Sequence, residues 1–274
     1  PMPRQLSIHG VLVPTLGLGT WQLSGDAAVA AVRHALDVGY RHIDTAQAYE
    51  NEEEVGRGIA ASGVARDEVF LTTKVWRESL APDDVKRTTD ESLRRLGTDY
   101  VDLLLMHWPS DDVPLEDTLG ALADVRDAGK ARLIGVSNTP SELLERALSI
   151  EPTLANDQVE YHPYLGQEEL LGTVRANGLF LTAYSPIARG RVTDDGTLQE
   201  IAEAHEATPT QVALAWLIAQ DRVAAVPKSG TPAHIEANLG ALDLTLSGDE
   251  RAAIDGLTRG QRLIDPGFAP EWDA

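Results

Sequence analysis

The sequence predicts an α/β fold, a (β/α)8 TIM barrel with an N-terminal β-hairpin cap, formed by a single domain over residues 1–274. Its 274 residues suffice for one substantial core and match the usual length of such a barrel. Short β-rich apolar runs alternate with helical patterns between about residues 16 and 230, as in the βαβ units of a parallel sheet. Eight such runs are present, at residues 16–19, 41–44, 69–74, 101–107, 132–137, 157–161, 179–184 and 224–228.

Two further apolar runs precede the first of these strands. Residues 5–8 and 11–13 flank His9-Gly10, and this spacing is typical of a small β-hairpin. A hairpin at this point in the chain is expected to cap the bottom of the barrel.

Residues that start and stop helices stand between the strands. Thr139-Pro140 followed by Glu142 combines an N-cap, proline at the first helical position and a capping-box glutamate. Ser247 and Glu250 have the same capping-box spacing. Helices are therefore expected at residues 26–38, from Pro82 to just before Gly97, from Pro140 onward, at 210–219 and at 247–257.

The composition excludes several classes of partner. The 23 Lys and Arg residues against 43 Asp and Glu give a net charge of −20, which repels nucleic acids and anionic membrane surfaces. The sequence has no cysteine and no i, i+4 pair among its seven histidines, so disulfides and a metal site are not expected. It also lacks an apolar stretch of about 18 residues, so a soluble, cytoplasmic chain is expected. A monomer is expected, because nothing in the sequence demands an interface.

Polar residues end several of the predicted strands. In a (β/α)8 barrel the C-terminal ends of the strands meet at one face, where active sites lie. Asp44, Lys74 and His107 end three different apolar runs, and Tyr49 follows Asp44 closely enough to return to the same face. Each alone has an ordinary explanation, as a loop cap, a solvated strand end or a buried histidine. Their occurrence together predicts one shared catalytic site.

The four side chains suit the reduction of a carbonyl group. A tyrosine hydroxyl has a pKa of about 10 and becomes an effective acid–base group when a nearby cation stabilises its phenolate. Lys74 would supply that cation, Asp44 would pair with Lys74, and His107 would hydrogen-bond the substrate oxygen. Negative charge develops on this oxygen as hydride reaches the carbon, so the reaction needs both a proton donor and an oxyanion partner.

Residues 39–52, GYRHIDTAQAYENE, followed by Val55-Gly56, resemble the signature of the aldo-keto reductase superfamily. The resemblance extends over essentially the whole chain, because further segments are similar to successive family motifs in the family's order. They are LGTW at 18–21, LTTKVW at 71–76, LMHWP at 105–109, GVSN at 135–138, QVEYHP at 158–163, AYSP at 183–186 and VPKS at 226–229. The chain resembles bacterial 2,5-diketo-gluconate reductase-like members, which implies an NADPH-dependent oxidoreductase that reduces aldehydes and ketones to alcohols.

The resemblance also implies a role for each matching residue. Tyr49 would be the general acid, tuned by Asp44 and Lys74, and His107 would orient the carbonyl. Amide and hydroxyl side chains would read the nicotinamide carboxamide, and an aromatic ring would stack on the nicotinamide. The cofactor-binding residues expected are Gly19, Thr20, Asp44, Ser137, Asn138, Gln158, Tyr184, Ser185, Pro186, Ile187, Lys228, Ser229, Gly230, His234 and Asn238. The substrate-binding residues expected are Trp21, Trp76, His107 and Trp108.

The phosphate end of the expected cofactor site departs from the family pattern. Lys228-Ser229-Gly230 runs into Thr231-Pro232, a helix start whose N–H groups lie beside a lysine and suit a phosphate. Family members usually carry an arginine in the following turn, where this chain has His234. A mostly neutral histidine cannot form the forked contact of arginine with a 2′-phosphate. NADPH is therefore expected, bound less tightly than usual, with NADH use as a hypothesis.

The substrate pocket is expected to be aromatic and open. Trp21, Trp76 and Trp108 follow three strand ends, and Trp272 lies in a tail that could fold over the same face. The connections after the fourth and seventh strands and the C-terminal tail are short. These features predict activity on small aldehydes, α-dicarbonyls or keto sugars.

Two other functions are compatible with this sequence. A cofactor-sensing regulatory barrel, resembling potassium-channel β subunits, would bind the nicotinamide without turnover. A Schiff-base aldolase would use Lys74 as a nucleophile at a barrel strand end and would need no nicotinamide.

Overall fold

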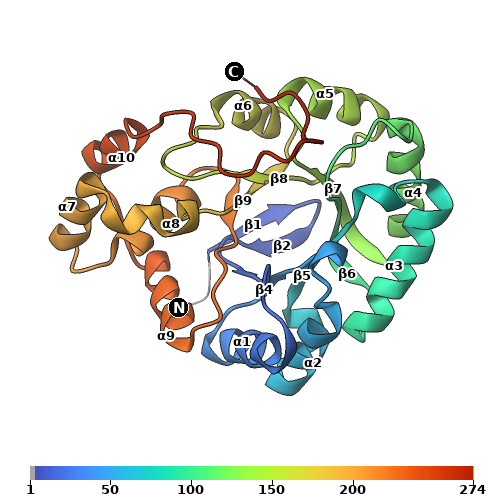
Figure 1. The fold of residues 1–274 in the computed structure, drawn as a ribbon, viewed down its shortest axis with the longest axis horizontal. Coiled ribbons are helices and arrows are strands. Elements are labelled where there is room, and N and C mark those ends of the chain that lie inside the picture. Colours follow the sequence, from blue (N-terminus) through green and yellow to red (C-terminus); the bar gives the residue numbers. More distant parts are fainter. Residues whose placement is uncertain (1–3, 274) are drawn as a thin grey trace.

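In the computed structural model, which describes residues 4–273, eight parallel strands form one sheet with the order β10-β9-β8-β7-β6-β5-β4-β3. Parallel bridges between Leu16 and Ala225 and between Gly19 and Lys228 join the two edges, so the sheet closes into a barrel (Figure 1). The predicted (β/α)8 barrel is confirmed; residues 1–3 and 274 of the expected domain lie outside the described residues. The strands are β3 (Leu18–Gly19), β4 (His42–Asp44), β5 (Phe70–Val75), β6 (Val101–Met106), β7 (Ala131–Ser137), β8 (Asn156–Glu160), β9 (Phe180–Tyr184) and β10 (Val223–Ala225).

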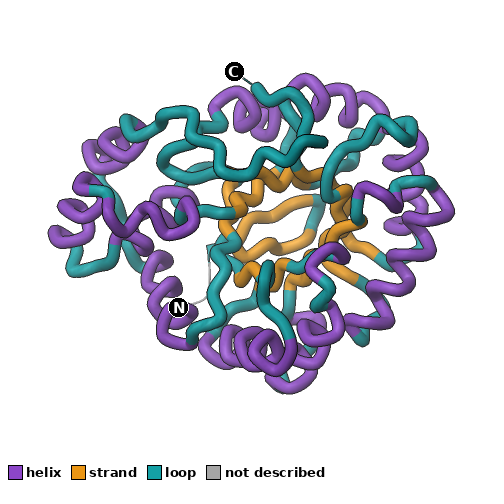
Figure 2. The backbone as a smooth tube through the Cα atoms, viewed as in Figure 1, coloured by secondary structure: helices purple, strands orange, loops and turns teal. Residues whose placement is uncertain are grey.

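Helices surround the sheet, and Figure 2 shows them as a ring around the central strands. Strand residues alternate between the two sides of the barrel wall. Leu104 therefore packs outward in the apolar cluster that contains the helix residues Val32 and Leu36, whereas Leu103 and Leu105 belong to the inner cluster. The helices are α1 (Gly25–Val38), α2 (Glu52–Ser62), α3 (Pro82–Leu96), α4 (Leu115–Asp127), α5 (Ser141–Ile150), α6 (Glu168–Ala176), α7 (Gly196–Ala204), α8 (Pro209–Ile218), α9 (Pro232–Leu239) and α10 (Gly248–Asp255).

The predicted hairpin closes the N-terminal end of the barrel. Strands β1 (Gln5–Ile8) and β2 (Val11–Pro14) pair antiparallel, and Figure 1 shows them within the ring of strands. Ile8, Val11 and Val13 are buried with inward-facing strand residues in the inner cluster. Apolar packing thus fills this end of the barrel, and the opposite end remains for a binding site.

The predicted caps have two outcomes. At α10, Ser247 and Glu250 form both hydrogen bonds of the expected capping box, so that prediction is confirmed. At α5 the expected Thr139 cap is wrong, because the helix begins at Ser141 and Pro140 occupies the cap position. The Asp273 carboxylate, from the C-terminal tail, instead accepts hydrogen bonds from the Ser141 N–H (3.0 Å) and hydroxyl (2.9 Å). An acid at a helix N-terminus is favoured by the helix dipole.

The C-terminal tail, drawn in red in Figure 1, runs from α10 across the end of the barrel opposite the hairpin and finishes beside α5. Its first turn is held by the Tyr164 carbonyl, which accepts from the N–H groups of Arg259 and Gln261. Within residues 4–273, no helix combines the length and apolar character needed to cross a membrane.

Candidate active site

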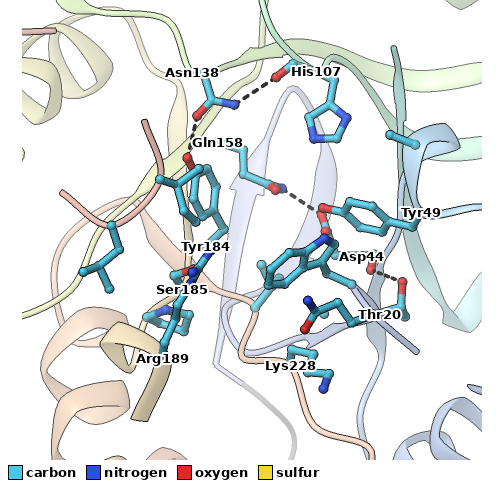
Figure 3. Close-up of a pocket in the computed structure, with 18 of the residues that line it drawn as sticks. Thr20, Asp44, Tyr49, His107, Asn138, Gln158, Tyr184, Ser185, Arg189 and Lys228 are labelled. Atoms are coloured by element: carbon cyan, nitrogen blue, oxygen red, sulfur yellow. Dashed lines mark hydrogen bonds between the residues drawn. The ribbon is translucent and has the colours of Figure 1, made fainter. Parts of the chain in front are cut away.

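The C-terminal ends of the strands surround a cavity of about 930 Å³ (Figure 3). This is the face where a (β/α)8 barrel carries its active site. The cavity is lined by Gly19, Thr20, Trp21, Gln22, Asp44, Ala48, Tyr49, Trp76, His107, Trp108, Asn138, Gln158, Tyr184, Ser185, Pro186, Ile187, Arg189, Gly190, Val226, Lys228, Leu263, Ile264, Asp265 and Pro266.

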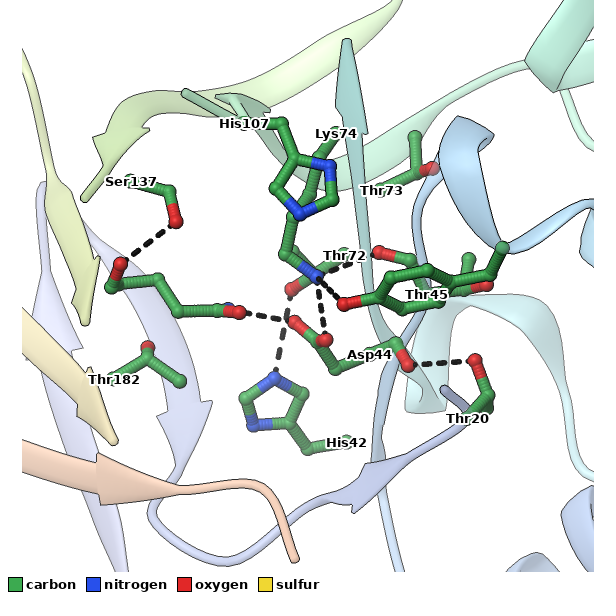
Figure 4. A network of polar contacts seen from close by, with 12 residues as sticks. Thr20, His42, Asp44, Thr45, Thr72, Thr73, Lys74, His107, Ser137 and Thr182 are labelled. Carbon is green, nitrogen blue, oxygen red and sulfur yellow. Dashed lines mark hydrogen bonds and ion pairs between the residues drawn. The ribbon is translucent and has the colours of Figure 1, made fainter. Parts of the chain in front are cut away.

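A buried ion pair lies at the base of the cavity (Figure 4). Lys74 Nζ is 2.6 Å from Asp44 Oδ1 and donates to the Thr45 carbonyl at 2.8 Å. The same nitrogen is 3.5 Å from the Tyr49 hydroxyl. The other Asp44 oxygen, Oδ2, accepts from Gln158 Nε2 at 2.7 Å. The two charges are therefore paired and hydrogen-bonded, as buried charges must be.

Burial shifts the pKa values of this cluster. Desolvation raises the pKa of Tyr49 well above 10, and the charge of Asp44 raises it further. Desolvation lowers the pKa of Lys74, although Asp44 opposes that shift. Burial and the charge of Asp44 outweigh the lowering of the Tyr49 pKa that Lys74 alone would cause. Tyr49 therefore carries its proton at neutral pH.

His107 completes the base of the cavity. Its ring lies edge-on to Tyr49, with ring centroids 5.8 Å apart, and edge-on to Trp76 at 5.3 Å. Burial and the charge of Lys74 hold the pKa of His107 well below 6.5, so the ring is neutral at pH 7. Its buried Nδ1 has no hydrogen-bond partner among the described residues.

Local structure brings Tyr49 back over the strand end. A 3₁₀ turn (Gln47–Tyr49) follows β4. Asn51 joins this turn to the loop after β3: its Oδ1 accepts from the Thr45 hydroxyl at 2.8 Å, and its Nδ2 donates to the carbonyls of Thr20 and Leu23. Asn51 stands inside the motif that contains Tyr49, which is the signal that could have identified it as a structural support.

The predicted amide residues lie together on one wall of the cavity (Figure 3). Asn138 has φ of 60°, in the left-handed region, and its side chain donates to the His107 carbonyl and accepts from the Tyr184 hydroxyl at 2.7 Å. Ser137 lies behind this wall, where its hydroxyl donates to the Gln158 carbonyl. Asn138, Gln158 and Tyr184 line the cavity, whereas Ser137 supports them.

The predicted phosphate-binding residues are brought only partly to the cavity. Lys228 is exposed and lines it. Thr231 occupies the cap position of α9 and Pro232 its first turn, as expected. His234 is exposed on α9, and Asn238 is buried there. Within residues 4–273, the lining of the cavity does not include Ser229, Gly230, His234 or Asn238.

Aromatic residues and the C-terminal tail contribute further to the lining of the cavity. Trp21, Trp76 and Trp108 line the cavity as predicted. Trp272 packs edge-on against Trp108, with centroids 6.0 Å apart, but tail residues 263–266 line the cavity in its place. Neither residues 263–266 nor Arg189 was expected from the sequence to line the cavity. Arg189 lies over Trp21, with its guanidinium carbon 5.4 Å from the ring centroid. No periodic or motif signal marks these loop residues in the sequence.

Lys74 is fully buried, and the described lining of the cavity does not include it. Its amino group is also engaged by Asp44 and the Thr45 carbonyl. This placement disfavours the Schiff-base alternative, which needs an accessible lysine. Among residues 4–273, no group of three or more His, Asp or Glu side chains is arranged to hold a metal ion.

A closed parallel barrel with a buried Asp–Lys pair beside a tyrosine and a neutral histidine has the groups that reduction of a carbonyl requires. The sequence model of the Aldo/keto reductase family matches residues 15–259, and the chain belongs to this family. It is an oxidoreductase that acts on carbonyl groups, since related reductases of this family cover nearly its whole length.

Relatives and solved structures agree on this assignment. The chain is 41% identical to methylglyoxal reductase DkgB of Escherichia coli O157:H7, over 95% of this chain and 99% of that protein. It is also 41% identical to glyoxal reductase of Bacillus subtilis strain 168, over 93% and 92%. A crystal structure assigned provisionally as 2,5-diketo-D-gluconic acid reductase B superposes with a TM-score of 0.97 at 45% identity, covering 100% of this chain and 98% of that one. The Bombyx mori aldo-keto reductase in complex with NADP superposes with a TM-score of 0.90 at 34% identity, covering 97% and 96%.

Proposed function

We propose that this enzyme, acting as a single-domain monomer, reduces small aldehydes, α-dicarbonyls and keto sugars with NADPH, and that Tyr49 donates the proton. One observation carries the proposal: Lys74 Nζ lies 2.6 Å from Asp44 and 3.5 Å from the Tyr49 hydroxyl, beside His107 and at the base of the cavity. This arrangement offers a proton and a hydrogen-bonding partner to a carbonyl oxygen at one point.

The proton chemistry follows from the pKa shifts. The bound nicotinamide supplies the hydride. Tyr49 is protonated at neutral pH and can donate to the carbonyl oxygen as negative charge develops there. Lys74, held by Asp44, is the nearest cation to the phenolate that remains. Neutral His107 hydrogen-bonds the same oxygen without competing as a stronger acid.

The residues on the amide wall fit a nicotinamide. Gln158 uses its amide nitrogen on Asp44, which leaves its carbonyl oxygen as an acceptor, and Asn138 Oδ1 accepts only the Tyr184 hydroxyl among the described residues. Both oxygens suit the N–H groups of a carboxamide, and the Tyr184 ring suits stacking. Gly19 allows the backbone at the end of β3 to pack closely against the segment after β10, since a Cβ there would lie 2.7 Å from the Val226 carbonyl oxygen.

The choice of NADPH rests on Lys228, a cation at the rim of the cavity beside the start of α9. The exposed His234 offers less to a 2′-phosphate than the family's usual arginine, so real use of NADH accompanies the proposal. The two kcat/KM values measure this directly. A preference for NADPH above about 1,000-fold, roughly 4 kcal/mol, would show that the missing arginine has little effect.

The test follows the loss of reduced cofactor absorbance with methylglyoxal and a simple aldehyde, for wild type and for Tyr49→Phe. We expect kcat to fall about a thousandfold in Tyr49→Phe with cofactor binding retained. Tyr161→Phe is the matched control: it also removes one buried hydroxyl, which donates to Gln220, and Tyr161 is not part of the cavity lining. Wild-type protein that binds NADPH but turns over no carbonyl would instead favour a cofactor-sensing barrel.

A further inference from the structure

Glu160, the last residue of β8, is a fully buried carboxylate that the proposed chemistry does not use. It accepts three hydrogen bonds. Its Oε1 accepts from the Leu263 N–H at 2.7 Å and lies 2.9 Å from His162 Nε2, and its Oε2 accepts from the Ile264 N–H at 2.9 Å. Hydrogen bonds to an ionised acceptor are about twice as strong as neutral ones, so this carboxylate is a firm attachment point for the tail.

The orientation of His162 is itself set by the backbone. The Tyr164 N–H donates to His162 Nδ1 at 3.3 Å, so Nδ1 is the acceptor and Nε2 carries the proton toward Glu160. Gln167 Nε2 also donates to the Glu160 main-chain carbonyl at 2.7 Å. Without the tail, the carboxylate therefore has one partner, His162, while Gln167 fixes the backbone beside it; the two tail N–H groups supply the other two hydrogen bonds.

The tail segment that Glu160 holds is part of the cavity wall. Leu263, Ile264 and Pro266 line the cavity, and the next aromatic, Phe268, packs edge-on against Trp76 at 6.0 Å and Trp108 at 5.5 Å. The tail has no helix or strand of its own between α10 and residue 273. Its position therefore depends on contacts with the barrel. Two of these contacts are the hydrogen bonds to Glu160, which are made by the backbone N–H groups of the lining residues Leu263 and Ile264.

We infer that Glu160 is a positioning residue: it holds Leu263 and Ile264 in the wall of the cavity, and this apolar wall favours, among the proposed α-dicarbonyl substrates, those that carry an apolar substituent. The inference rests on the proposed carbonyl reduction. A small substrate such as methylglyoxal places one methyl group beyond its reactive carbonyls, whereas phenylglyoxal carries a ring that needs a fixed apolar surface. Loss of the wall therefore weakens the binding of the larger substrate selectively.

The test uses Glu160→Gln in the full chain. An amide of the same shape has one acceptor oxygen, so its NH₂ group must face one of the two backbone N–H donors. We expect KM for phenylglyoxal to rise about tenfold, with KM for methylglyoxal changed less than about threefold and kcat less than about twofold. Hydrogen exchange of the amides of Leu263 and Ile264 should accelerate in the same variant, and this readout needs no turnover.

Asp102→Asn is the matched control. Asp102 is also a buried carboxylate that accepts from a backbone N–H, that of Leu71, and from two side chains, Arg66 and Arg132. It lies near the start of β6, at the end of the barrel opposite the cavity. This variant should lose stability without a change in either KM or in tail exchange.

Leu263→Ala and Ile264→Ala keep the inference testable if Glu160→Gln does not fold, since each shortens the wall directly and should also raise KM for phenylglyoxal more than for methylglyoxal. Unchanged tail exchange in Glu160→Gln, or equal KM changes for the two substrates, would overturn the inference while wild-type turnover keeps the proposed function. Absence of wild-type turnover would overturn the proposed function instead.

Discussion

The two ends of the barrel each bury an acid–base cluster, and the clusters differ in what surrounds them. At the cavity end, Asp44 and Lys74 have side-chain exposures of 4% and 1%. At the hairpin end, Asp102 is 2% exposed, but its partners Arg66 and Arg132 are 22% and 44% exposed. Both members of the Asp44–Lys74 pair are almost fully buried, whereas the Asp102 cluster keeps its cations partly exposed.

The two clusters use the same kind of interaction, a buried carboxylate paired with a cation, in different roles. Asp102 lies on β6 and accepts from Leu71 on β5 and Arg132 on β7, so the hairpin-end cluster ties three neighbouring strands together. The Asp44–Lys74 pair instead faces a cavity, where burial and charge raise the pKa of Tyr49 and lower that of His107. The low exposure of both Asp44 and Lys74 strengthens these shifts, because charges interact more strongly where water is excluded.

The largest loss of activity and stability is expected when the Lys74 cation at the cavity end is removed. Lys74→Met leaves Asp44 buried without its ion-pair partner, so we expect a loss of about 3 kcal/mol in unfolding free energy. kcat/KM should fall at least about a thousandfold, because nothing then stabilises the Tyr49 phenolate. Steady-state kinetics and urea unfolding measure the two changes. Asp102→Asn should reproduce only the loss of stability, and a comparable loss of kcat/KM in that variant would refute the contrast between the two ends.

A smaller effect is expected at the rim of the cavity. Lys228→Ala should raise KM for NADPH about tenfold and leave KM for NADH within about twofold, since the lysine would contact a charge that only NADPH carries. Lys130→Ala removes a cation paired with Asp90 and away from the cavity lining, and serves as the control. Equal increases for both cofactors would place Lys228 at a phosphate that they share.

Asp157 is a further buried acid, and within residues 4–273 it lacks the cationic partners of Asp44 and Asp102. Neither of its carboxylate oxygens has a hydrogen-bond partner among the described residues, and burial raises its pKa well above 3.8. An acid whose folded pKa is raised stabilises the fold below its unfolded pKa and loses that contribution as pH rises through the folded pKa. We therefore expect Asp157→Asn to gain about 1 kcal/mol more stability, relative to wild type, at pH 8 than at pH 5.

Urea unfolding at the two pH values measures this gain. Asp67→Asn, at a surface acid of the 3₁₀ turn before β5, is the control for a general effect of charge. If the stabilities of wild type and Asp157→Asn change in parallel with pH, Asp157 does not bear the expected cost of ionisation.

The smallest effect concerns pH and activity. Because the pKa of Tyr49 lies well above 10 and that of His107 well below 6.5, neither group titrates between about pH 7 and pH 9. kcat for reduction with saturating NADPH should change less than about twofold across this range, and fall only as pH rises through the Tyr49 pKa. A clear inflection inside the range would show that the bound cofactor or substrate reverses one of these shifts.

Much of the active site could be predicted because barrel strands end at one face. The positions of Asp44, Lys74 and His107 followed from the ends of apolar runs, and all three were brought together with Tyr49 as expected. The Thr139 cap predicted for α5 was wrong. The N-terminus of this helix is instead bound by Asp273, 132 positions along the chain from Ser141, and local spacing carries no information about such a partner.

The sequence by itself determined the barrel, its hairpin and the meeting of Asp44, Tyr49, Lys74 and His107, because periodicity and strand ends are local properties repeated along the chain. Only the tertiary structure decided that Glu160 holds the tail 103 residues away, and that residues 263–266 rather than Trp272 line the cavity. It also decided the direction of the Tyr49 pKa shift. Burial and pairing between distant segments arise only when the whole chain is packed, so no local pattern encodes them.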